Sequence, residues 1–226
     1  MLVISHRGYH VRAPENTLES FEAALAMGVD GIETDIRLSA DQVPILFHDH
    51  LAPDGRDVAS LSRAELGNAV GHPIPTLEQA LQLPLAGKTD FLWNLEIKTP
   101  AAVDQTVALV NRYRAFRRML ITSFWHPVIA EISRRIIEVD CGVLVAHRPI
   151  DMRAWPDLIA IHPQVKTVVW YWETIDAELI ANSIACGLCN FVYGVTTPEE
   201  HARLANWGLD GVITDHPEYL LAPRVG

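Results

Sequence analysis

Acidic side chains recur within apolar stretches in the first hundred residues of the chain. Glu33 and Asp35 lie inside "GIETDIRL", and Glu96 lies inside "FLWNLEIK". Near the start of the chain, His6 and Arg7 directly follow the apolar stretch "LVIS". Carboxylate oxygens are the ligands that hard cations such as Mg²⁺ and Ca²⁺ prefer. If the fold brings the three carboxylates together, the sequence predicts a divalent-cation site with a histidine and an arginine beside it.

The spacing of these residues favours shared faces of two strands. Alternate side chains of an extended strand point to the same side, so Glu33 and Asp35 share a face. By the same rule, Asn94, Glu96 and Lys98 share a face of the next motif. Carboxylates close together are costly to bury without compensation. Soft ligands are missing from these positions, so a structural zinc site is not predicted.

Short apolar strands alternate with helical patterns along the whole chain. Eight separate strands with helices between them predict a parallel sheet closed into a (β/α)8 TIM barrel. An open doubly wound sheet is the alternative, but it favours a glycine-rich phosphate loop after the first strand, and "SHRGYHV" has no GxGxxG. The predicted strands are 2–5, 31–38, 90–98, 118–124, 141–147, 165–171, 189–195 and 210–214. The predicted helices include 17–27, 101–114, 126–138, 176–185 and 197–206.

The chain is predicted to form one domain over residues 1–226, with a small insertion after the second strand. Following residues 31–38, "SADQ" and "VPILFHD" indicate a turn and a returning strand. A polar segment marked by Pro and Gly, at about 48–75, then leads to the helical pattern "TLEQALQL". In a barrel of this type the C-terminal ends of the strands form the catalytic face. The acidic and basic residues described above are therefore expected to gather at that end.

Composition excludes some classes of partner and location. The formal net charge is −10 at pH 7, which argues against a nucleic-acid partner because a phosphate backbone needs a basic surface. The cysteines number three, and an odd number suits a reducing compartment better than a disulfide framework. The sequence has no basic leader followed by an apolar run, and no apolar run of membrane-spanning length. We therefore predict a cytoplasmic protein with no integral membrane segment.

Several motifs together resemble one enzyme family. "HRG" with "PENT", then "ETDIRL", "VPILFHD" and "LEIK" are similar in order and spacing to the glycerophosphodiester phosphodiesterase family. "GVITDHPEYL", near the end, resembles the family's last strand and the start of its last helix. The resemblance spans nearly the whole chain. It implies a TIM barrel, a divalent cation and hydrolysis of a small-molecule glycerophosphodiester to glycerol phosphate and an alcohol.

The resemblance also implies a role for each matching residue. These roles are acid–base catalysis by His6 and His48, substrate phosphate binding by Arg7 and Lys98, and metal binding by Glu33, Asp35 and Glu96. One histidine would remove the proton of the glycerol 2-hydroxyl, whose oxygen attacks phosphorus, and the other would protonate the departing alcohol. Water would then open the cyclic phosphate with the roles of the two histidines reversed.

Three alternative functions make different demands on the sequence. A lysophospholipase D would use the same centre on a substrate that keeps an acyl chain, and an exposed apolar groove beside the mouth would favour it. A non-catalytic barrel that binds phosphodiesters or a partner protein is disfavoured by the complete set of two histidines and three carboxylates. A metal-dependent amidohydrolase is disfavoured because its first strand should end in His-x-His, whereas this one ends in "SHRG".

For a few residues near the motifs, the sequence predicts only a helix cap or no role at all. Asn16 is predicted to cap the first helix, and Asp215 to cap the last one. The roles of Glu15, Asp49 and Tyr193 are left open. The leaving alcohol, the physiological cation (Mg²⁺ or Ca²⁺) and the formation of a homo-oligomer are left open as well.

Overall fold

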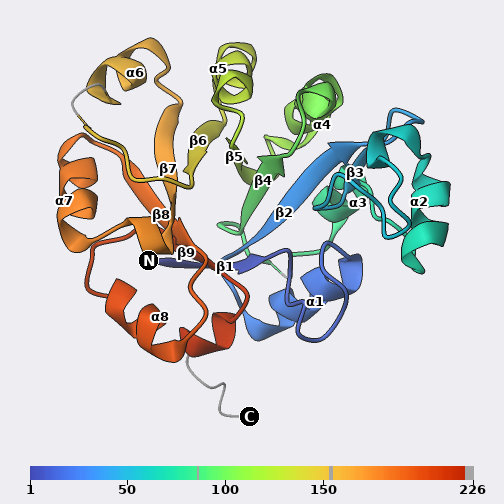
Figure 1. Cartoon of the computed structure of the whole chain (residues 1–226), viewed down its shortest axis with the longest axis horizontal. Coiled ribbons are helices and arrows are strands. Elements are labelled where there is room, and N and C mark those ends of the chain that lie inside the picture. The colour runs from blue at the N-terminus through green and yellow to red at the C-terminus, as the bar shows by residue number, and fades with distance from the viewer. Residues whose placement is uncertain (86, 153–154, 222–226) are drawn as a thin grey trace.

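Eight parallel strands in the described part of the chain form a closed barrel. The computed structural model describes residues 1–85, 87–152 and 155–221. The strands are β1 (Leu2–His6), β2 (Gly31–Leu38), β4 (Leu92–Ile97), β5 (Arg118–Ser123), β6 (Asp140–Val145), β7 (Val165–Tyr171), β8 (Cys189–Tyr193) and β9 (Gly211–Thr214). Strand β1 pairs with both β2 and β9, which closes the sheet. This arrangement confirms the predicted (β/α)8 TIM barrel (Figure 1).

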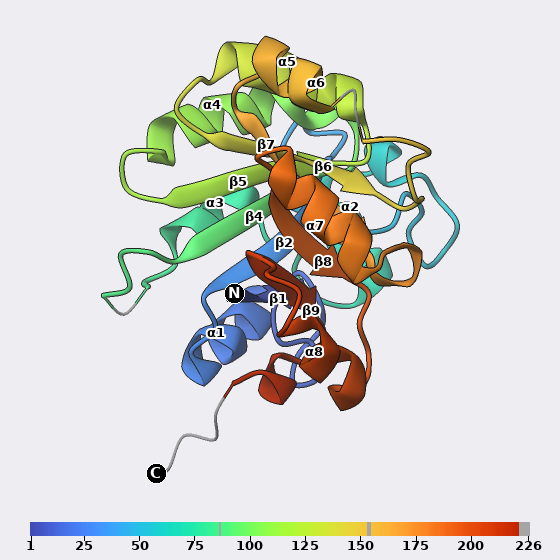
Figure 2. The same cartoon turned by 90° about the vertical axis from the view of Figure 1, so that its left-hand side faces the viewer.

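Helices lie between the strands in sequence and surround them in space. They are α1 (Leu18–Met27), α2 (Arg63–Val70), α3 (Leu77–Gln82), α4 (Val103–Tyr113), α5 (His126–Arg135), α6 (Trp155–Ile161), α7 (Ala177–Ala185) and α8 (Pro198–Leu204). In two perpendicular views, α1 lies on the opposite side of the strands from α4, α5 and α6 (Figures 1 and 2). None of the helices in the described residues has both the length and the apolar character needed to cross a membrane.

The predicted elements agree best with the structure where the apolar pattern is continuous. The bounds of β2 and β7 are those predicted, and the other barrel strands differ at their ends by one or two residues. The sequence patterns do not predict α2 or α6. Helix α2 lies in the polar insertion, and its start is marked only by a capping box between Ser62 and Glu65. Helix α6 is a short segment between Pro149 and Pro163, too brief for a helical period to show.

Two apolar layers hold the barrel together. Inward-facing side chains form one cluster inside the barrel, consisting of Ile4, Leu92, Leu120, Leu144, Val169, Phe191 and Ile213. The outward faces of the strands pack against the helices in a larger core that includes Phe21, Trp93 and Trp170. Burying one large apolar side chain contributes about 1.5–3 kcal/mol to stability. Because the interior is filled with side chains, charged groups have room only at the rim.

The insertion after β2 builds a small layer of its own. Strand β3 (Pro44–Leu46) runs antiparallel to β2, as the returning strand predicted from "VPILFHD". The insertion has a separate apolar cluster, which includes Ile45, Val58 and Leu66. In Figure 1, β3 and α2 lie together near the C-terminal end of β2, and β3 pairs with the last three residues of that strand. The insertion therefore extends from the C-terminal end of a barrel strand without interrupting the barrel.

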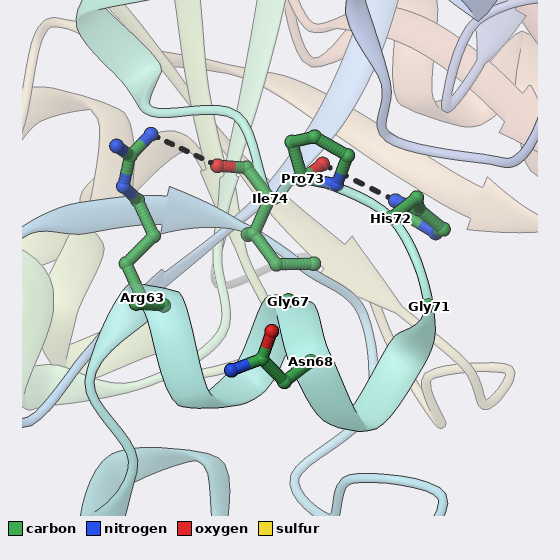
Figure 3. Close-up of a pocket in the computed structure, with 8 residues that line it drawn as sticks. Arg63, Gly67, Asn68, Gly71, His72, Pro73 and Ile74 are labelled. Carbon is green, nitrogen blue, oxygen red and sulfur yellow. Dashed lines mark hydrogen bonds between the residues drawn. The ribbon is translucent and has the colours of Figure 1, made fainter.

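A hollow of about 470 Å³ lies between α2 and residues 71–74 of the insertion (Figure 3). Arg63 donates a hydrogen bond of 3.2 Å to the carbonyl of Ile74. His72 Nδ1 lies 3.2 Å from the carbonyl oxygen of Pro73. Among the described residues, no acidic side chain and no residue of a barrel strand lines this hollow. Its polar contacts hold the insertion together rather than adding to the catalytic face.

Asn16 does not cap the first helix, contrary to the prediction. Thr17 caps α1, because its side chain accepts a hydrogen bond from the backbone N–H of Ser20. Asn16 is buried and has a left-handed φ of 56°. Its side-chain Nδ2 donates to Asp35 Oδ2 at 2.9 Å. The capping signal therefore starts one residue later, and Asn16 belongs to the rim of the barrel.

The predicted cap at Asp215 is also wrong. The last turn of the chain, Pro217–Tyr219, follows His216 and has no side-chain cap. Asp215 instead lies beside the imidazoles of His6 and His10. A carboxylate just after the last barrel strand is placed at the same rim as the residues that follow β1.

Gly8 allows the tight turn after β1. Its φ is +77°, and a Cβ added there would lie 2.3 Å from Ser20 Oγ. Gly8→Ala should cost about 1–2 kcal/mol from the left-handed backbone and about 1–3 kcal/mol more from overpacking, measured as a loss of unfolding free energy in urea. Gly55→Ala is the matched control, because its φ is +85° but nothing lies within 4 Å of the added Cβ. Equal losses in the two variants would contradict the packing account.

Candidate active site

Strand register places the predicted site residues at one end of the barrel. His6 on β1 is level with Glu33 on β2, and Glu33 is level with Asn94 on β4. Two residues further along, Asp35 is level with Glu96. Because these strands are parallel neighbours, the side chains emerge together at the C-terminal end of the barrel. The structure therefore gathers residues from across the first hundred positions, as the sequence predicts.

A cavity of about 140 Å³ lies at this end of the barrel. Its lining consists of His6, Arg7, Glu33, His48, Asn94, Glu96, Lys98, Thr122, Phe124, Leu144, Tyr193 and Ile213. Six of the seven predicted site residues are in this set, and the seventh, Asp35, is fully buried beside it. The imidazoles of His6 and His48 therefore face the same space as the carboxylates of Glu33 and Glu96.

Three carboxylates form the acidic centre of the site. One oxygen from each of Glu33, Asp35 and Glu96 lies within 4.8 Å of the other two, and all three side chains are buried. Burial and the charges of Asp35 and Glu96 raise the pKa of Glu33 well above its usual range. Burial, together with the charge of Asp35, also raises the pKa of Glu96. Both shifts follow from burial first and from the neighbouring negative charges second.

Two basic side chains offset part of this charge. Lys98 Nζ lies 2.7 Å from Glu96 Oε1 and 3.3 Å from Asp35 Oδ1. Arg7 Nε lies 3.1 Å from Asp35 Oδ2. Although burial acts in the opposite direction, Lys98 and Arg7 hold the pKa of Asp35 below its ordinary value. The contact of these two residues with substrate phosphate stays a prediction.

The acidic centre has the chemistry of a hard-cation site. Glu33 Oε1 is buried and accepts no hydrogen bond from the described residues. The carboxylates outnumber Lys98 and Arg7, so a divalent cation would turn a negative excess into a positive one. All the available ligand atoms are carboxylate oxygens, which suit Mg²⁺ or Ca²⁺. Glu33, Asp35 and Glu96 therefore fit the predicted metal-binding role.

The "PENT" segment fixes the charged groups around the acidic centre. Glu15 accepts hydrogen bonds from Arg7 Nη1 at 3.1 and 3.0 Å. Asn16 accepts a hydrogen bond from Thr34 and donates one to Asp35. Arg7 and Asn16 both have left-handed φ values, 54° and 56°, which cost a non-glycine residue about 1–2 kcal/mol each. Backbone strain of this kind persists where the surrounding contacts determine the conformation.

His48 reaches the cavity from the segment after β3. Its Nδ1 lies 2.8 Å from Asp49 Oδ1. Its backbone carbonyl accepts two hydrogen bonds from the Arg37 guanidinium, at 2.9 and 2.8 Å, which fixes the chain here. Burial lowers the pKa of His48, and the positive charge of Arg7 acts in the same direction. An imidazole that is neutral at pH 7 can accept a proton as a general base.

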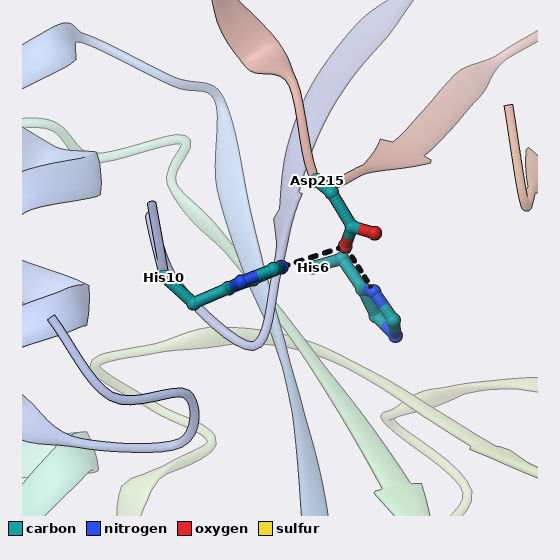
Figure 4. A group of neighbouring side chains, drawn as sticks. All are labelled: His6, His10 and Asp215. Atoms are coloured by element: carbon teal, nitrogen blue, oxygen red, sulfur yellow. Dashed lines mark hydrogen bonds and ion pairs between the residues drawn. The ribbon is translucent and has the colours of Figure 1, made fainter. Parts of the chain in front are cut away.

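His6 contacts Asp215, for which the sequence patterns predict no catalytic part, and Asp215 in turn contacts His10. His6 Nδ1 lies 2.6 Å from Asp215 Oδ1, and His6 Nε2 lies 3.8 Å from Glu33 Oε2. His10 Nε2 lies 2.9 Å from the same oxygen of Asp215, so both imidazoles point to one carboxylate (Figure 4). Asp215 directly follows β9, and the strand-end rule applied to "GVITD" would have found it. No periodicity or motif marks His10, which lies in a turn.

Polar and aromatic side chains complete the cavity wall. Asn94 Oδ1 accepts a hydrogen bond from Thr122 at 2.9 Å, and Asn94 Nδ2 has no partner among the described residues. Tyr193 meets Phe124 edge-on, with ring centroids 6.1 Å apart. Burial and the charge of Glu96 raise the pKa of Tyr193 to about 12, so its hydroxyl keeps its proton at neutral pH. The acidic centre is therefore flanked by an amide donor, a phenol and an apolar ring.

A family comparison agrees with this arrangement. The model of the glycerophosphoryl diester phosphodiesterase family matches residues 6–219. The chain belongs to this family. Membership makes it a phosphoric diester hydrolase and confirms the family resemblance of the sequence motifs.

Relatives of this phosphodiesterase match it over nearly the full length. A glycerophosphodiester phosphodiesterase from Caldanaerobacter subterraneus subsp. tengcongensis is 28% identical, with 97% of this chain and 96% of the relative aligned. The solved structure of a Silicibacter pomeroyi protein assigned to the same activity has a TM-score of 0.85 at 27% identity, over 97% of this chain and 91% of that one. An Oleispira antarctica phosphodiesterase, solved with the product sn-glycerol-3-phosphate, has a TM-score of 0.82 at 24% identity, over 96% and 94%.

The charge imbalance predicts that Glu33→Gln is more stable to heat than the wild type without a cation, and that it loses this advantage when a cation is added. In chelator at pH 8, the variant should unfold at a higher temperature than the wild type, because it removes a buried charge from a carboxyl group whose pKa is raised. Added Mg²⁺ or Ca²⁺ should stabilise the wild type, by about 2.7 kcal/mol at 100 times the Kd. The same addition should leave Glu33→Gln almost unchanged. Thermal unfolding followed by circular dichroism measures both effects.

Glu131→Gln is the control for this comparison. Glu131 is an exposed residue of α5 that pairs with Arg135, far along the chain from the acidic centre. The control should respond to the cation as the wild type does. Equal stabilisation of Glu33→Gln and Glu131→Gln would show that the cation binds elsewhere.

Proposed function

We propose that this phosphodiesterase cleaves glycerophosphodiesters to glycerol phosphate and an alcohol, using Mg²⁺ or Ca²⁺. The observation that carries the proposal is the single cavity that His6 and His48 share with Glu33 and Glu96. Bound by these two carboxylates and Asp35, the cation would supply a Lewis acid that polarises a phosphoryl oxygen and acidifies a hydroxyl. The named product of the Oleispira antarctica phosphodiesterase supports a glycerol phosphate product here.

Two imidazoles supply the proton transfers in this proposal. His48 has its Nδ1 beside Asp49 and His6 has its Nδ1 beside Asp215, so Nε2 of each ring is the nitrogen left for substrate. His48, whose pKa is lowered by burial, takes the proton of the glycerol 2-hydroxyl, and His6 protonates the departing alcohol. The hydroxyl oxygen bonds to phosphorus while the bond from phosphorus to the alcohol oxygen breaks, which gives a cyclic phosphate. Water then opens this ring with the histidine roles reversed.

Arg7 and Lys98 are proposed to bind the substrate phosphate. Both line the cavity beside the carboxylates. A guanidinium has five N–H donors, more than Arg7 uses in its contacts with Glu15 and Asp35. The ammonium of Lys98 adds a point charge on the same side of the cavity. Substrate phosphate would therefore bind to the Arg7 guanidinium and the Lys98 ammonium, which the carboxylates already hold in position.

One observation favours a second class of substrate. Phe124 lines the cavity and is 44% exposed, and Trp125 next to it is 54% exposed. A lysophospholipase D needs an apolar surface of this kind for the acyl chain of a lysophospholipid. The cavity itself is small, about 140 Å³, which suits a glycerophosphoryl group. Glycerophosphodiesters are therefore the first proposal, and lysophospholipids are the alternative.

We also propose a cytoplasmic location and a small-molecule substrate as the partner. All three cysteines are free, which suits a reducing compartment. The net charge of −10 supports a partner other than nucleic acid.

The histidine roles predict severe losses of turnover. His6→Ala and His48→Ala should each lower kcat by about 10²–10⁴-fold, because a positioned acid or base contributes that much. His72→Ala, in the insertion, is the matched control and should keep near-normal turnover. Circular dichroism should show the same fold in all three variants. Near-normal turnover of either cavity variant would remove that histidine from the mechanism.

A substrate and cation panel tests the function directly. Release of alcohol from glycerophosphodiesters and from lysophospholipids is measured with Mg²⁺, with Ca²⁺ and with chelator. We expect glycerophosphodiesters to be cleaved faster and chelator to abolish turnover. Faster cleavage of lysophospholipids would favour the alternative, equal turnover in chelator would refute the cation, and no turnover of either class would indicate a barrel that only binds.

A further inference from the structure

We propose that Asp215, held in place by His10, is a positioning residue that fixes the catalytic imidazole of His6. The inference rests on the proposed function, which makes His6 an acid–base group. It concerns two residues outside the seven that the motifs identify. Asp215 and His10 act through His6 and do not touch the substrate in this proposal.

The barrel itself places Asp215 beside His6. Ser5 on β1 pairs with Thr214, the last residue of β9, so the residues that follow these two in the chain, His6 and Asp215, lie side by side at the rim. Their contact joins His6 Nδ1 to Asp215 Oδ1 at 2.6 Å. The two residues are 209 positions apart in the chain, and only closure of the barrel between β1 and β9 brings them together.

His10 fixes the carboxylate from the other side. Its Nε2 lies 2.9 Å from the same oxygen of Asp215, and the rings of His6 and His10 stand at 78° to each other (Figure 4). The turn that carries His10 is closed by a backbone hydrogen bond of 3.0 Å to the carbonyl of Gly8. The side chain of Asp215 is 37% exposed, so a single contact would leave it free to turn toward solvent. Two donors on one oxygen hold it in one orientation.

This contact determines which nitrogen of His6 faces the cavity. A carboxylate can only accept a hydrogen bond, so in a neutral His6 the proton must be on Nδ1. Nε2 is then the unprotonated nitrogen, and it lies 3.8 Å from Glu33 Oε2 on the cavity side. Without Asp215 the ring could rotate, and its proton could occupy either nitrogen. The Asp–His pair of serine hydrolases uses the same physical principle.

The three residues also resemble a metal site, since their ligand atoms lie within 4.8 Å of one another. The acidic centre of Glu33, Asp35 and Glu96 differs from this cluster in how its polar atoms are paired. There, the carboxylates repel one another and one buried oxygen has no donor among the described residues. In the cluster of His6, His10 and Asp215, each close approach joins an imidazole nitrogen to a carboxylate oxygen. Hydrogen bonds satisfy this cluster, so it needs no cation.

The direct test is the tautomer of His6 in the full chain loaded with Mg²⁺ at pH 8. Long-range ¹H–¹⁵N NMR distinguishes a proton on Nδ1 from one on Nε2, and the His6 signal is assigned by its loss in His6→Ala. We expect neutral His6 to carry its proton on Nδ1 in the wild type and largely on Nε2 in Asp215→Ala. An unchanged tautomer in Asp215→Ala would overturn the proposal. This readout needs no turnover, so it separates failure of the proposal from failure of the proposed function.

Kinetics with a double-mutant cycle test the part of His10. Asp215→Ala should lower kcat by about 100-fold or more with KM changed by less than about two-fold. His10→Ala should lower kcat by about 3–10-fold, the worth of one hydrogen bond. The double variant should be no slower than Asp215→Ala alone, because His10 acts only through that carboxylate. Fully multiplicative losses, or a loss confined to KM, would contradict the assignment.

Discussion

Mutual repulsion among three buried carboxylates is the constraint on which the rest of the site depends. Glu33, Asp35 and Glu96 lie within 4.8 Å of one another, and Lys98 and Arg7 offset only part of their charge. Because the three carboxylates are buried, water does not screen the remaining negative charge, and the repulsion between them is strong. A divalent cation bound there would resolve the imbalance and, by reversing the sign of the local field, would give an acidic protein a place for an anionic phosphodiester.

The fold meets this constraint with rigid strands and strained connections. Strands β1, β2 and β4 fix the heights of His6 and the carboxylates through their register. The segment after β1 then holds Arg7 and Asn16 in left-handed conformations that direct both side chains to Asp35. The motif "HRG…PENT" therefore has a structural reason. It forms a sharp turn and brings the guanidinium of Arg7 and the side-chain amide of Asn16 into contact with the carboxylate of Asp35. Glu15, whose role the sequence leaves open, holds the Arg7 guanidinium.

Periodic features could be predicted from the sequence, and non-local contacts could not. The barrel and strands such as β2 follow from apolar alternation, and the family motifs bring six of the seven proposed site residues to one cavity, with Asp35 buried beside it. Asn16 and Asp215 have the residue types of helix caps, but tertiary contacts occupy both side chains instead. The strand-end pattern of "GVITD" could have placed Asp215 at the rim, but it does not identify the partners of that carboxylate. His10 carries no signal at all, because its partner lies 205 positions away. Barrel closure supplies that contact.

Anomalous diffraction from crystals soaked with Mn²⁺, a scatterer that can replace Mg²⁺ on oxygen ligands, tests the central claim most directly. The account predicts one strong peak within about 2.6 Å of an oxygen from each of Glu33, Asp35 and Glu96. Loss of that peak in crystals of Glu33→Gln would link it to the unpartnered carboxylate oxygen. No peak at the three carboxylates, or a peak only between His6, His10 and Asp215, would contradict the account.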